Sequence, residues 1–440
     1  MRYLKLYLFW ITAAILVTCA TMTKAQTVSR ELHNDANKSA GANYALPITT
    51  APTDTPAPDG KKPFYINHYG CPASHYLRHP NDYEAPYTTL SKADGLGKLT
   101  ALGKDVLRRI SLLRDDANNR TDELTASGKQ QSRTLMRQMV QRFPEVFTTK
   151  GYYSARSIVE NWCIETMNEA MVQLSQAKAP LQMNIKASQR EKPFMDPEDR
   201  QLEALRNDSS TQAALAAFAR SNTDDTRLIS TLFNDAAYMT ENIDAAALCQ
   251  QLFVLAGSVQ HTPMRETMTL YDIFTPEEIL SHWRVQNAKN YISYGNATQP
   301  YMQRATLRNM MHMGDSVLKR YNPIIHVRYT HEGVVMALAS LMELDHFGLQ
   351  TDSLDKLESM GWADYRIAPK GGSIELVHYR SSRDDNDVLV KVLLNGHEAR
   401  MPIPTDCAPY YHWNDVKRYY LRKLYRYENT RFTLKSPTVL

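Results

Sequence analysis

The chain has 440 residues, of which 43% are hydrophobic and 22% charged, and its formal net charge is +4. This composition is typical of a globular protein, and the length suffices for one large domain or two ordinary ones. The small net charge and the lack of a long basic run in the sequence argue against nucleic acid as a partner.

The first 25 residues have the pattern of a secretory signal peptide. A basic start precedes an apolar run at residues 6–20, and residues 23–25 form a small-x-small cleavage site. An uncleaved membrane anchor is one alternative, although the run is short for a span. Lipid attachment at Cys19 is another. We expect an exported protein, periplasmic or secreted, with no transmembrane segment after cleavage.

Cleavage at this site leaves four cysteines, Cys71, Cys163, Cys249 and Cys407. They are too few and too scattered for a disulfide scaffold or a CxxC metal site. In an oxidising compartment one or two disulfides can form, and the three full pairings remain open.

Regular structure is expected to begin after a linker. Residues 26–61 are rich in Thr, Ala, Pro, Asp and Asn, which predicts an extended linker or surface arm. A strand at 64–69 follows, and then helices at 99–117 and 123–147 with apolar residues at helical spacing. Thr100 can cap the first of these helices.

The next segment changes from alternating elements to helices alone. A strand at 151–155, a helix at 157–174 and a strand at 181–186 are followed by residues 190–300, which carry few strand signals. Residues 275–278 form a good helix start, with Thr as N-cap, Pro at the first position and two Glu in the first turn. Residues 190–300 therefore read as an all-helical insertion.

Alternation returns in the last third of the chain. The expected elements are, in order, a helix at 306–321, a strand at 324–330, a helix at 332–344, strands at 365–369, 373–380 and 387–396, and a helix at 413–427. This pattern predicts an α/β sheet with helices on both faces and an antiparallel edge. The expected core comprises residues 62–189 and 301–440, with residues 190–300 as a cap.

A series of stretches carries a resemblance to a known family over about residues 60–427. They are GKKPFYINHYG (60–70), KLTALGKDVL (98–107), ELTASGKQQSR (123–133), RFPEVF (142–147), ARSIVENWC (155–163), DIFTPEEILSHWRVQNAKNYISYG (272–295), VRYTHEGVV (327–335), DVLVKVLLN (387–395) and APYYHWNDV (408–416). Together they make the chain resemble the histidine acid phosphatases, branch 2 of the histidine phosphatase superfamily. The resemblance is greatest to bacterial multiple inositol polyphosphate phosphatases.

This resemblance implies a fold and an activity. The fold is a phosphoglycerate-mutase-like α/β core, with a mostly parallel central sheet flanked by helices and an inserted α-helical cap. The family activity is hydrolysis of phosphomonoesters or inositol polyphosphates, without a cofactor. Residues 70–75, 155–162 and 330–332 each follow a strand, so we expect them to meet at the carboxyl ends of the strands, where such sheets carry their sites.

The chain departs from the family at the phosphate-binding loop, which in the family reads Arg-His-Gly-x-Arg. Cys71 stands at the first arginine, Pro72 at the nucleophilic histidine, Ala73 at the glycine and His75 at the second arginine. Proline has neither a nucleophilic side chain nor a backbone donor. Each lost arginine removes a charge-assisted phosphate contact worth about 1.5–3 kcal/mol.

Other family positions are partly kept. The third phosphate arginine falls on Trp162, which either fills the vacated space or stacks on a ligand. Arg156 matches a family arginine that is mainly a structural neighbour. His331 and Glu332 match the family's acid pair, which contacts phosphate and protonates the leaving group. The predicted catalytic residues are therefore this pair, and the predicted substrate-binding residues are Cys71, His75, Arg156 and Trp162.

Three functions stay open on this evidence. The first, which we favour, is an inactive homologue that binds a small phosphorylated or polyol ligand or a partner. The second is an active phosphomonoesterase with His75 or Cys71 as an unusual nucleophile and the acid pair as proton donor. The third is a structural or surface-interaction protein. A metal site built from His68, His75, His79 and His331 fits no zinc spacing, so no metal is expected.

Overall fold

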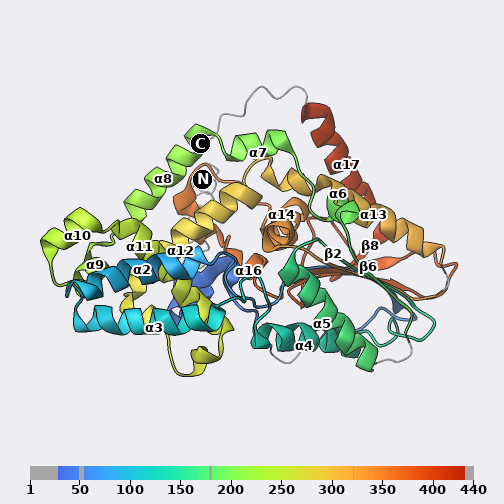
Figure 1. Ribbon diagram of the computed structural model, residues 1–440. Coiled ribbons are helices and arrows are strands. Elements are labelled where there is room, and N and C mark those ends of the chain that lie inside the picture. Colours follow the sequence, from blue (N-terminus) through green and yellow to red (C-terminus); the bar gives the residue numbers. More distant parts are fainter. Residues whose placement is uncertain (1–27, 49–53, 178–180, 321, 432–440) are drawn as a thin grey trace, which may run out of the picture.

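The computed structural model describes residues 28–48, 54–177, 181–320 and 322–431. The expected signal peptide and Cys19 lie outside these residues. Figure 1 shows a sheet covered by helices at one end of the molecule and a group of helices at the other.

One sheet forms the centre of the core. Its strands are β1 (Lys62–Gly70), β2 (Tyr152–Ser157), β3 (Met183–Ala187), β4 (Ile324–Tyr329), β5 (Ser373–Arg380), β6 (Leu389–Leu394), β7 (His397–Glu398) and β8 (Tyr410–His412). The order is β3-β2-β4-β1-β5-β6-β7, and β8 also pairs with β6. Strands β3, β2, β4 and β1 are parallel to one another, whereas β5 to β8 add in antiparallel fashion. The predicted α/β class and antiparallel edge are confirmed, and the sheet is mixed rather than mostly parallel.

Helices cover both faces of the sheet. Figure 1 shows α4 (Ala126–Arg142) and α5 (Asn161–Ala177) on one face. Helices α13 (Arg304–Leu318), α14 (Glu332–Met342) and α17 (Trp413–Arg431) lie on the other. Helix α14 is buried almost throughout, because its sequence is apolar on all sides.

The remaining helices form the second part of the molecule or connect it to the core. They are α2 (Asn81–Gly95), α3 (Ala101–Ala117), α6 (Lys192–Met195), α7 (Arg200–Arg206), α8 (Ser209–Asn222), α9 (Thr226–Leu232), α10 (Ala236–Asn242), α11 (Ala245–Ser258), α12 (Pro276–Asn290), α15 (Leu357–Met360) and α16 (Asp364–Ile367). Short 3₁₀ or π turns are η1 (Ala36–Asn43), η2 (Gln189–Glu191), η3 (Val259–His261), η4 (Pro263–Glu266), η5 (Tyr271–Ile273), η6 (Tyr291–Gly295), η7 (Gln299–Gln303), η8 (Leu344–His346) and η9 (Leu354–Lys356).

The helical part has its own hydrophobic core, which extends beyond the expected insertion. Its buried residues come from α2, α3, α9, α11 and α12, and also from the N-terminal segment through Val28 and Leu32. Residues 28–34 are helical and are followed by η1. The expectation of an extended linker is therefore wrong for residues 28–43, because apolar side chains in this segment are buried against the cap.

Local signals predicted helix starts well. The Thr100 hydroxyl accepts from the Gly103 amide at 3.1 Å and caps α3. Thr275 and Glu278 form a reciprocal capping box at the start of α12. By contrast, residues 365–369 are not a strand: they overlap α16, and helix α2 was not predicted.

The short helix α16 is fixed by contacts distant in sequence. The Asp364 carboxylate accepts hydrogen bonds from Trp283 Nε1 at 3.1 Å and from Asn290 Nδ2 at 2.7 Å. Both donors belong to α12, so a tertiary anchor overrides the local strand preference of this apolar run.

Two further findings concern the described residues only. No single helix among them is long and apolar enough to cross a membrane; α10 together with the segment Ala245–His261 passes by length and composition, but the two are bent by 89°. Cys71, Cys163, Cys249 and Cys407 are all free thiols.

Candidate functional site

Four loops meet where the parallel strands end. The Thr330 amide donates to the Gly70 carbonyl at 3.0 Å, and the Ile158 amide donates to the Tyr329 carbonyl at 3.2 Å. The Cys71 amide donates to the Gly372 carbonyl at 2.7 Å. The three loops predicted from the sequence therefore converge, and the loop before β5 joins them.

Three amides of the loop at residues 71–75 are engaged within the protein, beginning with that of Cys71. The Ala73 amide donates to Thr166 Oγ1 at 3.0 Å, and the Ser74 amide donates to Gln131 Oε1 at 3.0 Å. Pro72 has no amide hydrogen, and its carbonyl accepts from Gly371 at 2.8 Å. A phosphate cradle needs backbone N–H groups aimed at the anion, and those of Cys71, Ala73 and Ser74 are committed elsewhere.

A lysine that the sequence analysis missed lies at the centre of the site. Lys370 Nζ donates to His75 Nε2 at 2.6 Å and forms an ion pair with Glu332 Oε1. The side chains of Lys370 and His75 are 4% and 5% exposed, and that of Glu332 is 16% exposed. We call these three residues the lysine cluster.

The hydrogen bonds fix the charge state of the lysine cluster. His75 Nδ1 lies 2.6 Å from the Tyr76 carbonyl, so this nitrogen carries the proton and Nε2 accepts from Lys370. Burial and then the Lys370 charge lower the pKa of His75 to about 3. Burial alone raises the pKa of Glu332, but Lys370 and His75 bring it down to about 2. Near neutral pH the cluster holds a neutral imidazole, an ammonium and a carboxylate.

Trp162 occupies space beside the lysine cluster. Its ring centroid is 5.7 Å from that of His75, and the Arg78 guanidinium lies 5.2 Å from the Trp162 ring centroid. Trp162 is 6% exposed. Its environment agrees with a side chain that fills the space rather than one that presents an open stacking surface.

Cys71 is buried at the start of the loop and is 1% exposed. Burial raises the pKa of its thiol well above the usual range, with a smaller contribution from Glu332. The sulfur is therefore a neutral thiol, and the attacking species of a cysteine nucleophile is the thiolate.

The two members of the predicted acid pair have different partners. Glu332 belongs to the lysine cluster, whereas His331 Nε2 lies 3.1 Å from Asp196 Oδ1. The His331 and Asp196 side chains are 30% and 29% exposed, so this contact reaches solvent. The Thr330 hydroxyl donates to the Met195 carbonyl at 3.3 Å, which also ties the strand end to this segment.

Arg156 is not part of this group. Its guanidinium donates to the Ala155 and Asn184 carbonyls at 2.9 and 2.7 Å and lies 3.4 Å from Glu191. It links β2 to β3 and to the following turn, which is a structural role.

The solvent side of the site carries two further arginines that the sequence analysis missed. Burial raises the pKa of Tyr294, and the nearby charges of Arg206 and Arg78 oppose this shift. The Tyr294 ring lies directly over Gly333: a Cβ added there would be 2.4 Å from Tyr294 Cζ. With His331, which lies two residues before Gly333, we group these side chains as a candidate binding set and call it the cleft mouth: Arg78, Arg206, Tyr294 and His331.

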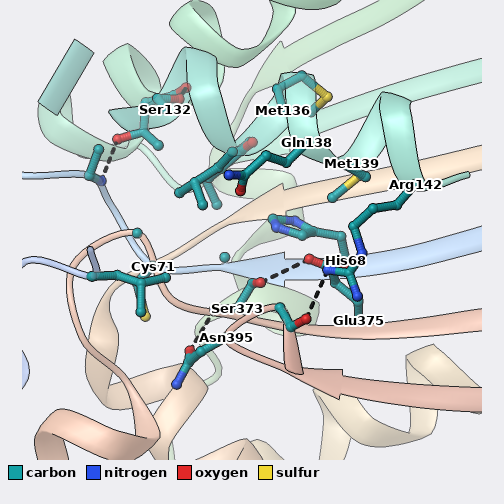
Figure 2. Close-up of a pocket in the computed structure, with 18 residues that line it drawn as sticks. His68, Cys71, Ser132, Met136, Gln138, Met139, Arg142, Ser373, Glu375 and Asn395 are labelled. Carbon is teal, nitrogen blue, oxygen red and sulfur yellow. Dashed lines mark hydrogen bonds between the residues drawn. The ribbon is translucent and has the colours of Figure 1, made fainter. Parts of the chain in front are cut away.

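Two small cavities flank the 71–75 loop. One, of about 20 Å³, is lined by His75, His261 and Phe253 on the cap side. The other, of about 50 Å³, lies beside α4 and is lined by Cys71, Ala73, His68 and Glu375, among others (Figure 2). A cavity needs about 10–15 Å³ to hold one water, so these take waters rather than an inositol phosphate.

Comparisons with known proteins agree on the fold. The sequence matches no protein-family profile and no curated protein sequence. The structure is similar to multiple inositol polyphosphate phosphatase from Bifidobacterium longum in its apo form, with a TM-score of 0.69 and 14% identity over 87% of this chain and 96% of that chain. The complex of that enzyme with inositol hexasulfate gives 0.69 and 13% over 86% and 97%. The phytase from D. castellii gives 0.63 and 14% over 88% and 85%. The chain therefore has the histidine acid phosphatase fold.

Proposed function

We propose that this chain is an exported, catalytically inactive relative of the histidine acid phosphatases that binds a small phosphorylated or polyol ligand at the cleft mouth. The observation that carries the proposal is the lysine cluster: with Pro72 at the nucleophile position, the remaining polar groups bind each other. They do not present a vacant phosphate site.

The energetics of the lysine cluster support inactivity. A phosphate that bound Lys370 would displace Glu332 from its only cation in the cluster, and would leave a largely buried carboxylate without a cation. Breaking a buried ion pair in this way costs about 3–5 kcal/mol. With the phosphate arginines absent from the loop, little remains to offset that cost.

The cleft mouth supports a binding role. Arg78 is exposed and Arg206 is half-buried. Guanidinium groups favour bidentate contacts with phosphate oxygens. His331 and the Tyr294 hydroxyl add groups that can bond to ligand hydroxyls. The ligand class that fits this set is a small molecule with hydroxyls and at least one anionic group.

One observation favours a second function, an active phosphomonoesterase with His75 as nucleophile. The bond from His75 Nδ1 to the Tyr76 carbonyl leaves Nε2 with a lone pair, as a histidine nucleophile needs. Lys370 would then have to leave Nε2 and hold the phosphate instead, with Glu332 as proton donor.

A hydrolysis assay separates these functions. Purified protein is incubated with p-nitrophenyl phosphate and with inositol hexakisphosphate between pH 4 and 8, beside His75→Ala and Cys71→Ser. We expect no phosphate release above background from any of them. Turnover that disappears in His75→Ala or Cys71→Ser would establish the active enzyme and reject the proposal. The double variant Cys71→Arg with Pro72→His tests whether restoring the loop restores activity.

A calorimetric titration tests the binding role. Inositol hexakisphosphate, inorganic phosphate and myo-inositol are titrated into wild type, Arg206→Ala and His331→Ala. Arg220→Ala, an exposed arginine on α8, serves as the matched control. Saturable binding that weakens at least tenfold in the first two variants and not in the control supports the cleft mouth. Absence of binding by wild type at millimolar ligand contradicts it.

Export is tested separately, because it does not depend on the site. Cell fractionation with mass spectrometry of the mature N-terminus should find a chain that begins at Gln26. A cytoplasmic chain that retains Met1 would contradict export.

A further inference from the structure

A second cluster of polar side chains lies at the sheet edge formed by β6 and β8, apart from the lysine cluster. Asp406, Cys407 and His412 each place one donor atom there, and the three atoms lie within 4.8 Å of one another. His412 Nε2 is 3.0 Å from Asp406 Oδ1. The set therefore combines a thiol, an imidazole and a carboxylate at one point.

The imidazole is already oriented for a role at this point. His412 Nδ1 lies 2.6 Å from Asp387 Oδ1, and the carboxylate fixes the proton on that nitrogen. Asp387 is itself held, since its amide donates to Asp385 Oδ1 at 2.9 Å. A carboxylate bound to the far nitrogen of a histidine is the arrangement that orients histidines toward bound metals. Here it turns Nε2 toward Asp406 and Cys407, and an ion would replace the present hydrogen bond between Nε2 and Asp406.

The loop that carries the thiol is also fixed by its own hydrogen bonds. The Thr405 hydroxyl donates to the Tyr410 carbonyl at 2.7 Å, and the Tyr410 amide donates to the Cys407 carbonyl at 2.9 Å. Cys407 Sγ lies 3.3 Å from Thr405 Oγ1. The sulfur is a half-buried free thiol at the same edge as His412.

We propose that Asp406, Cys407 and His412 bind a divalent cation of the zinc class, with a fourth position open to solvent. Tetrahedral zinc with bonds of about 2.0–2.3 Å places its ligand atoms about 3.3–3.8 Å apart. Donor atoms within 4.8 Å of one another reach that geometry with small side-chain rotations. Sulfur and imidazole nitrogen favour zinc over magnesium or calcium, which prefer oxygen ligands.

This proposal departs from the sequence expectation of no metal. That expectation considered the histidines near the phosphate loop, whereas these ligands come from a surface loop and strand β8. Asp387 contributes from the segment just before β6, so a bound ion would link three separate segments of the antiparallel edge. A ligand that binds only the folded chain stabilises it by mass action.

Cobalt provides the first readout, because a thiolate bound to cobalt(II) gives a charge-transfer absorption band. The full mature chain, kept reduced, is titrated with cobalt(II) and then with zinc(II), beside Cys407→Ser, His412→Ala and the control His397→Ala. We expect a saturable band that zinc displaces in wild type and in the control, and no band in Cys407→Ser. The other described thiols, Cys71, Cys163 and Cys249, are buried.

The remaining outcomes decide the proposal. Asp387→Asn keeps every ligand and should weaken cobalt affinity about 10–100-fold, the usual loss when an orienting carboxylate is removed. A wild-type chain without the band at millimolar cobalt overturns the proposal, and so does a band that persists in Cys407→Ser. Circular dichroism of each variant shows whether it is folded, so that lost binding is not mistaken for lost structure.

Discussion

Two buried regions on either side of the 71–75 loop contain the same residue types in opposite states. The lysine cluster pairs His75 with Glu332 through the Lys370 ammonium. In the cavity beside α4 (Figure 2), His68 and Glu375 have no lysine between them. The difference shows that a nearby cation decides whether a buried carboxyl group is ionised.

The carboxyl groups of Glu332 and Glu375 differ in the direction in which their pKa values are shifted. Lys370 keeps the pKa of Glu332 at about 2, so it is ionised. Burial raises the pKa of Glu375, and Arg142 offsets this only in part. Arg142 is committed to Asp54, with bonds of 2.8 and 2.9 Å. A buried carboxyl therefore stays charged where a cation is dedicated to it, and shifts toward the neutral acid where the cation is shared.

The histidines differ in partners rather than in charge. Burial lowers the pKa of both His75 and His68 to about 3. His75 uses both ring nitrogens, whereas His68 Nδ1 has no hydrogen-bond partner among the described residues. The histidine of the lysine cluster therefore has more hydrogen-bond partners than the histidine of the cavity beside α4. This is what we expect of a site that is closed to phosphate.

Removing the cation should have the largest effect. Lys370→Met leaves Glu332 largely buried without a cation, so that it either stays charged without a partner or takes up a proton, and we expect the free energy of unfolding to fall by about 3–5 kcal/mol in urea titrations. The double variant Lys370→Met with Glu332→Gln removes both charges and should recover part of this loss. A single variant that loses less than about 1 kcal/mol would show that the ammonium is not buried in the pair.

We expect the second-largest loss of stability when Trp162 is replaced by the arginine that the family resemblance assigns to this position. Trp162→Arg removes ring contacts with His75 and places a second cation near Lys370 without an anion to receive it. We expect a loss of about 2–4 kcal/mol, measured by thermal and urea unfolding. Trp162→Phe, which keeps an aromatic ring, should lose less. An Arg variant as stable as wild type would mean that the space beside His75 is open to solvent.

Acidification should destabilise the protein through its neutral histidines. Both His75 and His68 have folded pKa values of about 3, below the usual 6.5. The unfolded chain therefore binds more protons between these values, and stability falls as the pH drops from 6.5 toward 3. Glu332 adds a loss in the same direction between about pH 4.5 and 2.

A pKa difference of one unit corresponds to about 1.4 kcal/mol, so the loss by pH 4 should exceed about 1 kcal/mol for each histidine. Urea midpoints at several pH values measure it. His68→Gln should make the dependence shallower if His68 is one source. A stability that does not change from pH 7 to 4 contradicts the assignment.

We expect the smallest change in stability from Glu375→Gln, and its comparison with Glu332→Gln distinguishes the two carboxyl groups directly. Glu375→Gln replaces a group that burial already drives toward the neutral acid, so at pH 7 we expect a change within about 1 kcal/mol of wild type. Glu332→Gln, its matched control, leaves Lys370 unpaired and should be clearly destabilised at the same pH. Equal losses in the two variants would remove the contrast between the regions.

The sequence predicted the parts of this fold that depend on local signals. Thr100 and the Thr275–Glu278 box begin helices because side chain and backbone satisfy each other within four residues. Asn395 and Gly396, at the end of the expected strand at 387–396, are residue types that tolerate positive φ, and both adopt it, at 53° and 80°. The meeting of the three loops was expected because each follows a strand of the sheet that the resemblance implies.

The site itself depended on contacts that no local pattern encodes. Lys370 and His75 are 295 positions apart in the sequence, and no sequence motif around His75 predicts their contact. One signal was available: Lys370 lies between Pro369 and two glycines at the start of β5, a turn beside the end of β1. A lysine in a turn at a sheet's carboxyl edge is a candidate for filling a phosphate position.

The central claim is that the lysine cluster occupies the position that the family resemblance assigns to phosphate. The most direct measurement is a crystal structure grown with millimolar orthovanadate, an anion with the geometry of phosphoryl transfer. We predict that Lys370 Nζ remains bonded to both His75 Nε2 and Glu332, with no anion between them. Vanadate within hydrogen-bond or covalent distance of His75 Nε2, with Lys370 turned toward the anion, would contradict the account and identify an active phosphatase.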